Sequence, residues 1–309
     1  MNNKNNRLKE QLSVLLGEVD KYLSDENIFE VIVNPDGKVF LKTNEGDKKS
    51  KYILDEKKRR QVINQIASFS KNVANEEVPL LAAEFFNMRF QGFLPPAAEA
   101  PCFNIRKHTS KVLSLDDYVK SNIMTEQQKR IIIEHINNKK NIIVAGATYS
   151  GKTTLLNAIL SEIAKTKDRI VMIEKEPELI CSSENKLSLR ATEKISMDML
   201  LKATLRATPD RIIVGEVRGE EALTLLDAWS TGHGGGASTI HANSAKDTIT
   251  RLEQLVARVL DKNIEYVIGQ AVNLIIYIKY LGTTRKITSI AEVMGYDRKR
   301  TRINMFFWK

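Results

Sequence analysis

The loop Gly146–Thr153, with the sequence GATYSGKT, constrains the fold of this chain more than any other feature. It follows the pattern G-x4-G-K-T, directly after the apolar run Ile142–Ala145 and directly before a helical stripe of apolar residues. A strand, a glycine-rich loop and a helix in this order are the context of a phosphate-binding loop, in which backbone N–H groups and the helix N-terminus face a phosphate. We therefore expect a nucleoside triphosphate to bind at the following residues: Gly146, Ala147, Thr148, Tyr149, Ser150, Gly151, Lys152, Thr153 and Thr154.

Two side chains of this loop have expected chemical roles. Lys152 would place its ammonium group near the β- and γ-phosphate oxygens, and Thr153 would offer its hydroxyl to Mg²⁺. The expected cofactors are therefore the triphosphate and Mg²⁺.

From about residue 141 onward, apolar runs alternate with helical stripes. The runs 142–145, 170–173 and 212–214 are typical of central strands in a mainly parallel sheet that is covered on both faces. Between them lie stripes with i, i+3, i+4 spacing, such as the one that begins at Leu155. Further strands are expected at 273–280, 286–294 and 305–308. This part of the chain is predicted to be an α/β domain.

The first hundred or so residues have a different pattern. An amphipathic helix with Leu8, Leu12, Leu15 and Leu16 comes first, and its interspersed charges are unlike a secretory signal. Next come a β-hairpin over 27–43 around Asn34–Gly37, a helix with Val62, Ile63, Ile66 and Phe69 on its apolar face, and strands at 88–93 and 102–105 on either side of Pro95-Pro96. The predicted domains are a smaller α+β domain at 1–107, a linker at 108–123, and an α/β domain at 124–309 whose first helix is capped by Thr125 and Gln128.

Composition narrows the class of protein. The chain has no apolar run of about 18 residues, so no membrane-spanning helix is expected. Cys102 and Cys181 lack CxxC or Cys/His spacing, which predicts buried or half-buried thiols instead of a disulfide or zinc site. The net charge of +9 is compatible with nucleic acid, an anionic membrane or phosphates as partners. The basic clusters Lys57–Arg60 and Arg298–Arg302 contain no aromatic residues for base stacking, so we expect solvated surface there and no direct nucleic-acid binding.

Two carboxylates and one histidine are candidate catalytic groups. Glu174 and Glu216 each follow a predicted buried strand, and α/β sheets bind ligands at such strand ends. One carboxylate would organise the water shell of the metal, and the other would orient or deprotonate the attacking water. The segment Thr231–Asn243 is dense in glycine, which permits close approach of backbone to a ligand. It ends in a short predicted strand that places His241 where an imidazole can contact the γ-phosphate.

Together these segments resemble a known family. GATYSGKTT, RIVMIEKEPEL, LLKATLRATPDRIIVGEVRG and STGHGGGASTIHANSAKDTITRLEQL are similar to the P-loop, Asp box, Walker B and His box of the type II/type IV secretion ATPases. The last two segments are most similar to the TrbB-type ATPases of conjugation systems. The resemblance covers about Arg89 to Gln254 well.

The resemblance implies an ATPase with a RecA-like P-loop domain and a smaller N-terminal domain. Such an enzyme works as a cytoplasmic homohexamer at the inner membrane, with membrane components of a secretion complex as partners, and it drives substrate transfer or pilus assembly. The resemblance assigns Glu174 to catalysis, Glu216 to the metal through water, and His241 to sensing the γ-phosphate. It also assigns Arg89 and Arg106 to contacts with the triphosphate when the domains close.

Two departures from the family pattern leave alternatives open. Tyr149 stands where the family usually has glycine, and Lys175 stands where it usually has aspartate. We expect Lys175 to lower the pKa of Glu174 and so to weaken it as a base. A switch that binds ATP with little turnover is therefore one alternative, and a RecA-like DNA motor or helicase is another.

Overall fold

The computed structural model describes residues 2–43, 46–107, 112–259, 264–282, 284–297 and 302–308. The chain divides into two compact units, Met1–Thr109 and Ser110–Lys309. Part of the predicted linker, 108–111, lies outside the described residues. In the rest of it the structure has helix α4 (Leu115–Lys120), which starts with a capping box formed by Ser114 and Asp117. Because α4 buries Leu115 and Tyr118 in a core cluster of the second unit, this segment is part of that unit and not a linker.

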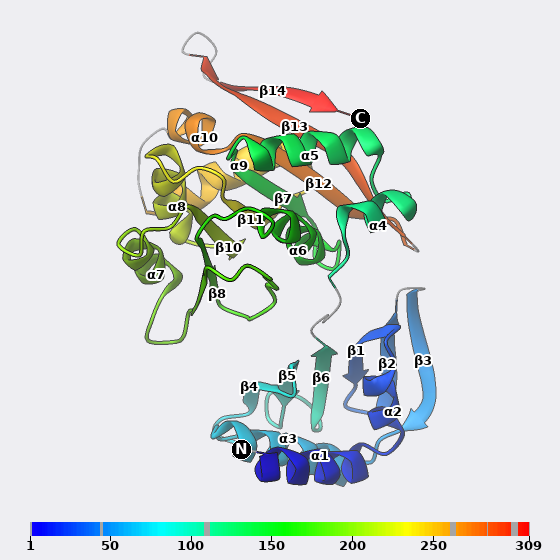
Figure 1. The fold of residues 1–309 in the computed structure, drawn as a ribbon. Coiled ribbons are helices and arrows are strands. Elements are labelled where there is room, and N and C mark those ends of the chain that lie inside the picture. Colours follow the sequence, from blue (N-terminus) through cyan, green and yellow to red (C-terminus); the bar gives the residue numbers. More distant parts are fainter. Residues whose placement is uncertain are drawn as a thin grey trace. The chain divides into compact units, whose positions relative to one another are not determined.

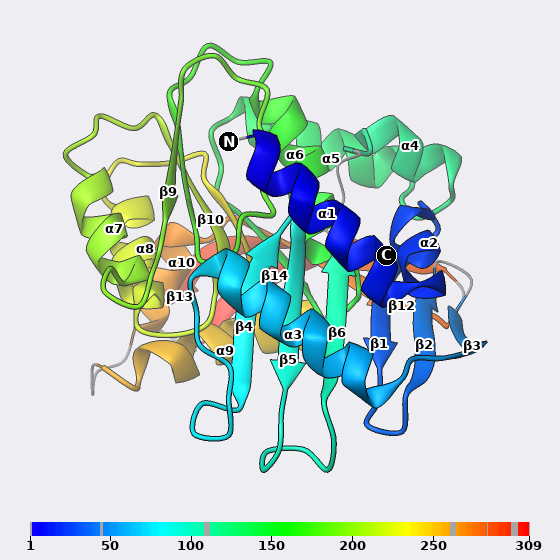
Figure 2. The same ribbon diagram turned by 90° about the horizontal axis from the view of Figure 1, so that it is seen from below.

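The first unit is an antiparallel sheet with strand order β3-β2-β1-β6-β5-β4. Helices α1 and α3 lie across one face of it (Figure 2). Val31 of β1 and Ile105 of β6 join Val62 and Ile63 of α3 in its core. The elements are α1 (Asn2–Leu16), α2 (Glu18–Ser24), β1 (Ile28–Val33), β2 (Lys38–Thr43), β3 (Gly46–Ile53), α3 (Glu56–Ser70), β4 (Leu80–Phe85), β5 (Met88–Phe93) and β6 (Cys102–Lys107).

Some of the helices and strands of this unit were predicted from the sequence. The first helix, the hairpin β1–β2, helix α3 and strands β5 and β6 are confirmed. The edge strands β3 and β4 were missed. The basic cluster that starts at Lys57 is also different from the prediction, because Arg59 is buried. Its guanidinium donates to the carbonyl oxygens of Pro101 and Pro35 at 2.6 Å each. The other basic cluster, 298–302, lies outside the described residues except for the backbone of Arg302.

The second unit is an α/β domain, as predicted (Figure 1). Its sheet has the order β14-β13-β12-β7-β11-β10-β8-β9. Strands β12 to β9 of that order are parallel, and β13 and β14 are antiparallel additions at one edge. The elements besides α4 are α5 (Glu126–Asn137), β7 (Ile142–Gly146), α6 (Lys152–Ile163), β8 (Ile170–Glu174), β9 (Lys186–Arg190), α7 (Met197–Thr204), β10 (Arg211–Val217), α8 (Glu221–Ser230), β11 (Ala237–His241), α9 (Ala245–Val256), α10 (Glu265–Ala271), β12 (Leu274–Tyr280), β13 (Arg285–Asp297) and β14 (Arg302–Trp308).

Two core clusters cover the two faces of this sheet. Ile143 and Ala145 of β7 belong to the cluster that contains residues of α7 to α10. Ile142 and Val144 belong to the cluster that contains residues of α4, α5 and α6. Because every residue of β7 is buried, the strand reads as a continuous apolar run, and this explains why it was predicted correctly. Helix α5 begins after Thr125, which forms the predicted capping box with Gln128.

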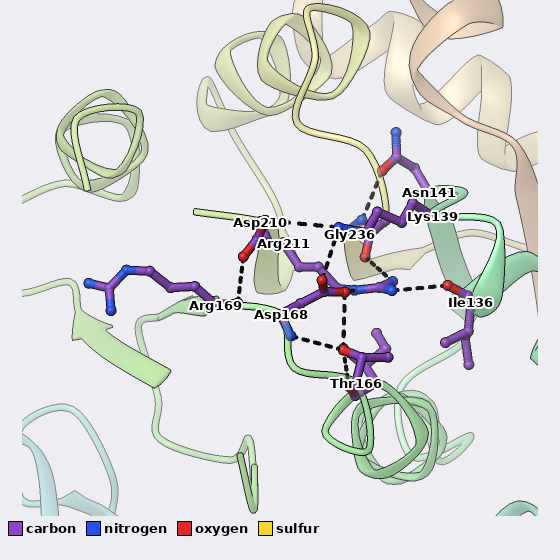
Figure 3. A network of polar contacts seen from close by, with 11 residues as sticks. Ile136, Lys139, Asn141, Thr166, Asp168, Arg169, Asp210, Arg211 and Gly236 are labelled. Carbon is purple, nitrogen blue, oxygen red and sulfur yellow. Dashed lines mark hydrogen bonds and ion pairs between the residues drawn. The ribbon is translucent and has the colours of Figure 1, made fainter. Parts of the chain in front are cut away.

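A polar network holds the amino ends of the strands that carry the candidate site (Figure 3). Arg211, the first residue of β10, is 1% exposed. Its Nε donates to Asp168, just before β8, at 2.7 Å, and Nη1 donates to the carbonyl of Gly235, just before β11, at 3.1 Å. Nη2 donates to the carbonyl of Ile136 in α5 at 3.1 Å. The guanidinium therefore links helix α5 to the amino ends of the strands β8, β10 and β11.

The carboxylate of Asp168 is the negative partner in this network. It also lies 2.9 Å from Nζ of Lys139 and accepts a hydrogen bond from Thr166 at 3.0 Å. Burial by itself would raise the pKa of Asp168, but the hydrogen bonds from Lys139 and Arg211 outweigh it, so the pKa lies below its usual value. Asp168 is thus held in its charged form.

Replacing Asp168 by alanine is expected to destabilise the protein by about 3–5 kcal/mol, because it leaves the charge of Arg211 buried without its partner. Urea unfolding of the wild type and of Asp168→Ala measures this difference. The control is Asp210→Asn, because Asp210 is about half exposed and accepts a bond from the backbone of Arg169 that an asparagine oxygen can also accept. Equal unfolding midpoints for Asp168→Ala and the wild type would show that Arg211 does not depend on this carboxylate.

Candidate functional site

The predicted phosphate-binding loop connects β7 to α6. Gly146 ends β7, and Lys152, Thr153 and Thr154 form the first turn of α6. A Cβ atom on Gly146 would lie 2.4 Å from the carbonyl oxygen of Ile278, so no other residue fits there. Gly151 has φ +94°, a conformation that favours glycine. These two glycines are explained by backbone geometry.

Tyr149 is a non-glycine residue in the same loop with φ 63°. The left-handed region is unfavourable for a residue with a Cβ atom, particularly a bulky one. The pattern G-x4-G-K-T permits a side chain at this position, but the structure shows that its backbone has the conformation that glycine prefers. Tyr149 is 38% exposed.

Lys152, His241 and Glu216 form a continuous group of contacts. Lys152 is 7% exposed, and its Nζ donates to the carbonyl of Ala147 at 2.9 Å and lies 3.3 Å from Nδ1 of His241. Nε2 of His241 lies 2.9 Å from Oε1 of Glu216. The imidazole of His241 therefore lies between the ammonium group of Lys152 and the carboxylate of Glu216. The structure thus brings together three predicted site residues from α6, β11 and β10.

Glu216 is held as a carboxylate. Its second oxygen accepts a hydrogen bond from Arg218 at 2.6 Å. Burial would raise the pKa of Glu216, but the hydrogen bonds from His241 and Arg218 outweigh it and lower the pKa to about 2. Because the group stays negative across the physiological range, it can bind a metal or its water shell and is a poor proton acceptor. No sequence pattern indicated the contact that Arg218 makes with Glu216.

Glu174 has the opposite properties. It ends β8, is 8% exposed, and its Oε1 accepts backbone hydrogen bonds from Glu178 and Leu179, both at 2.8 Å. Burial raises the pKa of this carboxyl above its usual value, against the effect of the two backbone bonds. The expectation that Lys175 lowers this pKa is therefore wrong, because Lys175 is exposed and burial dominates. A raised pKa makes Glu174 the better proton acceptor of the two glutamates.

Asn157 on α6 supports the loop after β8, a role that the sequence did not predict. It is buried, its Nδ2 donates to the carbonyl of Glu178, and its Oδ1 accepts from the N–H of Ile180, both at 2.9 Å. These bonds hold the loop after β8 whose N–H groups bond Glu174. A lone asparagine on a predicted helix carries no pattern that would indicate this.

Two of the glycines in Thr231–Asn243, Gly235 and Gly236, are explained by close packing. A Cβ on Gly236 would lie 2.2 Å from Nε1 of Trp229, and one on Gly235 would lie 2.8 Å from Nη1 of Arg211. Both glycines precede β11, so they are at the opposite end of this strand from His241. Their small size serves close packing against Trp229 and Arg211, and not the approach of a ligand.

The two predicted arginines lie in the first unit. Arg89 on β5 and Arg106 on β6 are direct cross-strand partners. In the same row, Arg89 is opposite Glu84 on β4, and Arg106 is opposite Glu30 on β1. The register therefore places two cations side by side between two carboxylates.

A cavity of about 560 Å³ opens beside the phosphate-binding loop, with Ala147, Thr148, His241, Asp247 and Arg251 in its lining. This volume is in the usual range of small-molecule sites. Within the described part of the chain, no helix is both long and apolar enough to cross a membrane.

Comparison with known proteins agrees with this geometry. A family described as type II/IV secretion system protein matches residues 16–286. The conjugal transfer protein TrbB of Rhizobium radiobacter is 41% identical over 278 residues, 89% of this chain and 86% of that protein. The type IV secretion system protein VirB11 of Bartonella henselae is 28% identical over 284 residues, 78% of this chain and 80% of that protein.

Among solved structures, the Legionella pneumophila ATPase DotB has a TM-score of 0.66 at 18% identity and covers 92% of this chain and 82% of its own, which supports the predicted fold. The match to the family extends over most of the sequence and includes the phosphate-binding loop and both glutamates. The chain therefore belongs to the type II/IV secretion system protein family, as one of its nucleotide-binding ATPases.

Proposed function

We propose that this chain is the ATP-hydrolysing motor subunit of a conjugal transfer or type IV secretion apparatus, in which it powers substrate translocation or pilus assembly. The observation that carries the proposal is the group formed by Lys152, His241 and Glu216 at the carboxyl ends of adjacent parallel strands, with Glu174 at the end of the next strand. The similarity to conjugal transfer proteins supports the choice of apparatus.

The proposed roles follow from charge and pKa. Lys152 binds the β- and γ-phosphate oxygens, where its charge offsets the negative charge that develops during transfer. Glu174 accepts a proton from the attacking water, since burial raises its pKa. His241 connects Lys152 to Glu216, so it can respond to the presence of the γ-phosphate.

Mg²⁺ fits the oxygen donors at this site. Thr153 supplies a hydroxyl from the first turn of α6, and the ionised carboxylate of Glu216 can hold a metal-bound water. When bound, the metal ion neutralises charge on the β- and γ-phosphates.

The proposed assembly is a homohexamer at the cytoplasmic face of the inner membrane, in contact with membrane components of the apparatus. Arg89 and Arg106 support an assembly, because these paired cations lie in a different unit from the phosphate-binding loop. They are proposed to contact the triphosphate when the first unit closes over the second, within one subunit or across a ring interface. When each subunit contacts the next head to tail, and the rotation between neighbours brings the last subunit back to the first, the subunits form a closed ring.

Replacing Arg106 by alanine is expected to lower ATP turnover by about 10- to 100-fold with little change in nucleotide affinity. A sole arginine finger contributes on the order of 10³ to 10⁵ in rate, and the expected loss is smaller because Arg89 remains beside the substituted position. The measurements are phosphate release against protein concentration and sedimentation with a non-hydrolysable ATP analogue.

Lys57→Ala is the matched control, because it removes one exposed positive charge from the same unit. We expect it to leave both the rate and the hexameric sedimentation unchanged. A wild-type protein that stays monomeric at all concentrations, together with an Arg106→Ala variant as fast as the wild type, would contradict both the ring and the arginine assignment.

A further inference from the structure

Arg285 lies against the phosphate-binding loop, although it is far from this loop in the sequence. It is the first residue of β13 and the cross-strand partner of Tyr280, the last residue of β12. A Cβ atom on Gly151 would lie 3.0 Å from Cδ and 3.3 Å from Nε of Arg285. The stem of this arginine therefore touches the glycine that directly precedes Lys152.

The guanidinium group of Arg285 is held over an aromatic ring. Its Cζ lies 5.4 Å from the centre of the Tyr280 ring, within the range of a cation–π contact. The side chain is half-buried, and it forms no ion pair with any carboxylate in the described part of the chain. The guanidinium of Arg285 is therefore oriented by its contacts with Tyr280 and Gly151 and not by a salt bridge.

The sheet order places this pair on the side of β7 away from the catalytic groups. Glu174, Glu216 and His241 belong to β8, β10 and β11, which all lie on one side of β7. The strands β12 and β13 lie on its other side. If the γ-phosphate of a bound nucleotide meets the catalytic groups, its nucleoside lies at the other end of the ligand, and Arg285 and Tyr280 stand on the side of β7 opposite those groups.

We infer that Arg285, oriented by Tyr280, is the stacking residue for the base of the bound nucleotide. Bases stack on arginine guanidinium planes and on aromatic rings, and such contacts are tolerant of base identity. This inference rests on the proposed function, since it assumes that the loop binds a nucleotide. It adds a site for the nucleoside, which none of the sequence motifs contains.

The test compares a ligand with a base to one without. Isothermal titration of the full chain measures binding of ADP and of inorganic tripolyphosphate, both with Mg²⁺. Arg285→Ala is expected to weaken ADP binding by about tenfold or more, within the range of stacking contacts, while tripolyphosphate binding changes less than about twofold. Arg285→Lys keeps the charge but not the plane, so it is expected to weaken ADP binding to a similar extent.

The matched control is Lys286→Ala, which removes an exposed cation at the next position of the same strand and should change neither affinity. Equal loss of ADP and tripolyphosphate binding in Arg285→Ala, or wild-type ADP affinity in Arg285→Lys, would mean that Arg285 acts by charge on phosphates and would overturn the inference. Lys152→Ala distinguishes this result from failure of the proposed function. If that variant binds both ligands as the wild type does, the loop is not the phosphate site at all.

Discussion

Replacing Lys152 by alanine is expected to lower the rate of ATP hydrolysis on the order of 10³-fold, as removal of a preorganised charge-stabilising group does in other enzymes. The ammonium group is mostly buried at the start of α6, beside His241, where it can act on the β- and γ-phosphate oxygens. Phosphate release at saturating ATP measures the effect. The variant should remain folded, because Lys152 bonds a loop carbonyl and belongs to neither core cluster.

Lys165→Ala is the control for Lys152→Ala. Lys165 comes just after helix α6, and its side chain is 69% exposed. Among the described residues, it forms an ion pair only with the nearby Glu162. This control should hydrolyse ATP at the wild-type rate, and all three proteins should give the same thermal unfolding transition. A Lys152→Ala variant with full turnover would remove the loop from the active site.

Replacing Glu174 by glutamine is expected to lower turnover by about 10² to 10⁴-fold with ATP binding retained, as loss of a general base does. Glutamine can still accept the N–H groups of Glu178 and Leu179, so the loop after β8 stays in place. It cannot accept a proton from water. Single-turnover phosphate release and equilibrium binding of ATP separate the two effects.

The control for this substitution is Glu184→Gln, at an exposed position after the same loop, which should have wild-type activity. In the wild type, turnover should fall on the acid side as Glu174 becomes protonated. Since its pKa is raised, this loss begins at a higher pH than for an ordinary glutamate. Unchanged phosphate release in Glu174→Gln would exclude it as the base, and a wild type that binds ATP without any phosphate release would favour the switch alternative.

Buried periodic segments were predictable from the sequence. The strand β7 is continuously apolar and followed by a diagnostic loop, and α3 and α5 have clear apolar faces. The edge strands β3 and β9 were missed. Strand β3 carries few apolar residues, and β9 has only five residues, none of which is buried. The short helix α4 was missed because six residues give no periodicity, although its capping box is visible in the sequence.

The candidate site was predictable where a residue belongs to a local motif. Lys152, Glu174, Glu216 and His241 each stand next to a strand or a glycine-rich loop, and the structure puts three of them in contact. Residues that act through tertiary contacts were not predictable. Arg285 reaches Gly151 only because β12 pairs with β7, and no spacing in the sequence encodes that pairing.

Asn157 links helix α6 to the loop that holds Glu174. Helix α6 begins at Lys152, and through Asn157 the same helix grips the backbone of residues 178–180, which in turn bonds Glu174. The proposed phosphate-binding group, Lys152, and the proposed base, Glu174, are thus both supported by helix α6. We therefore expect the spacing between Lys152 and Glu174 to stay constant when a nucleotide binds, because both side chains depend on helix α6.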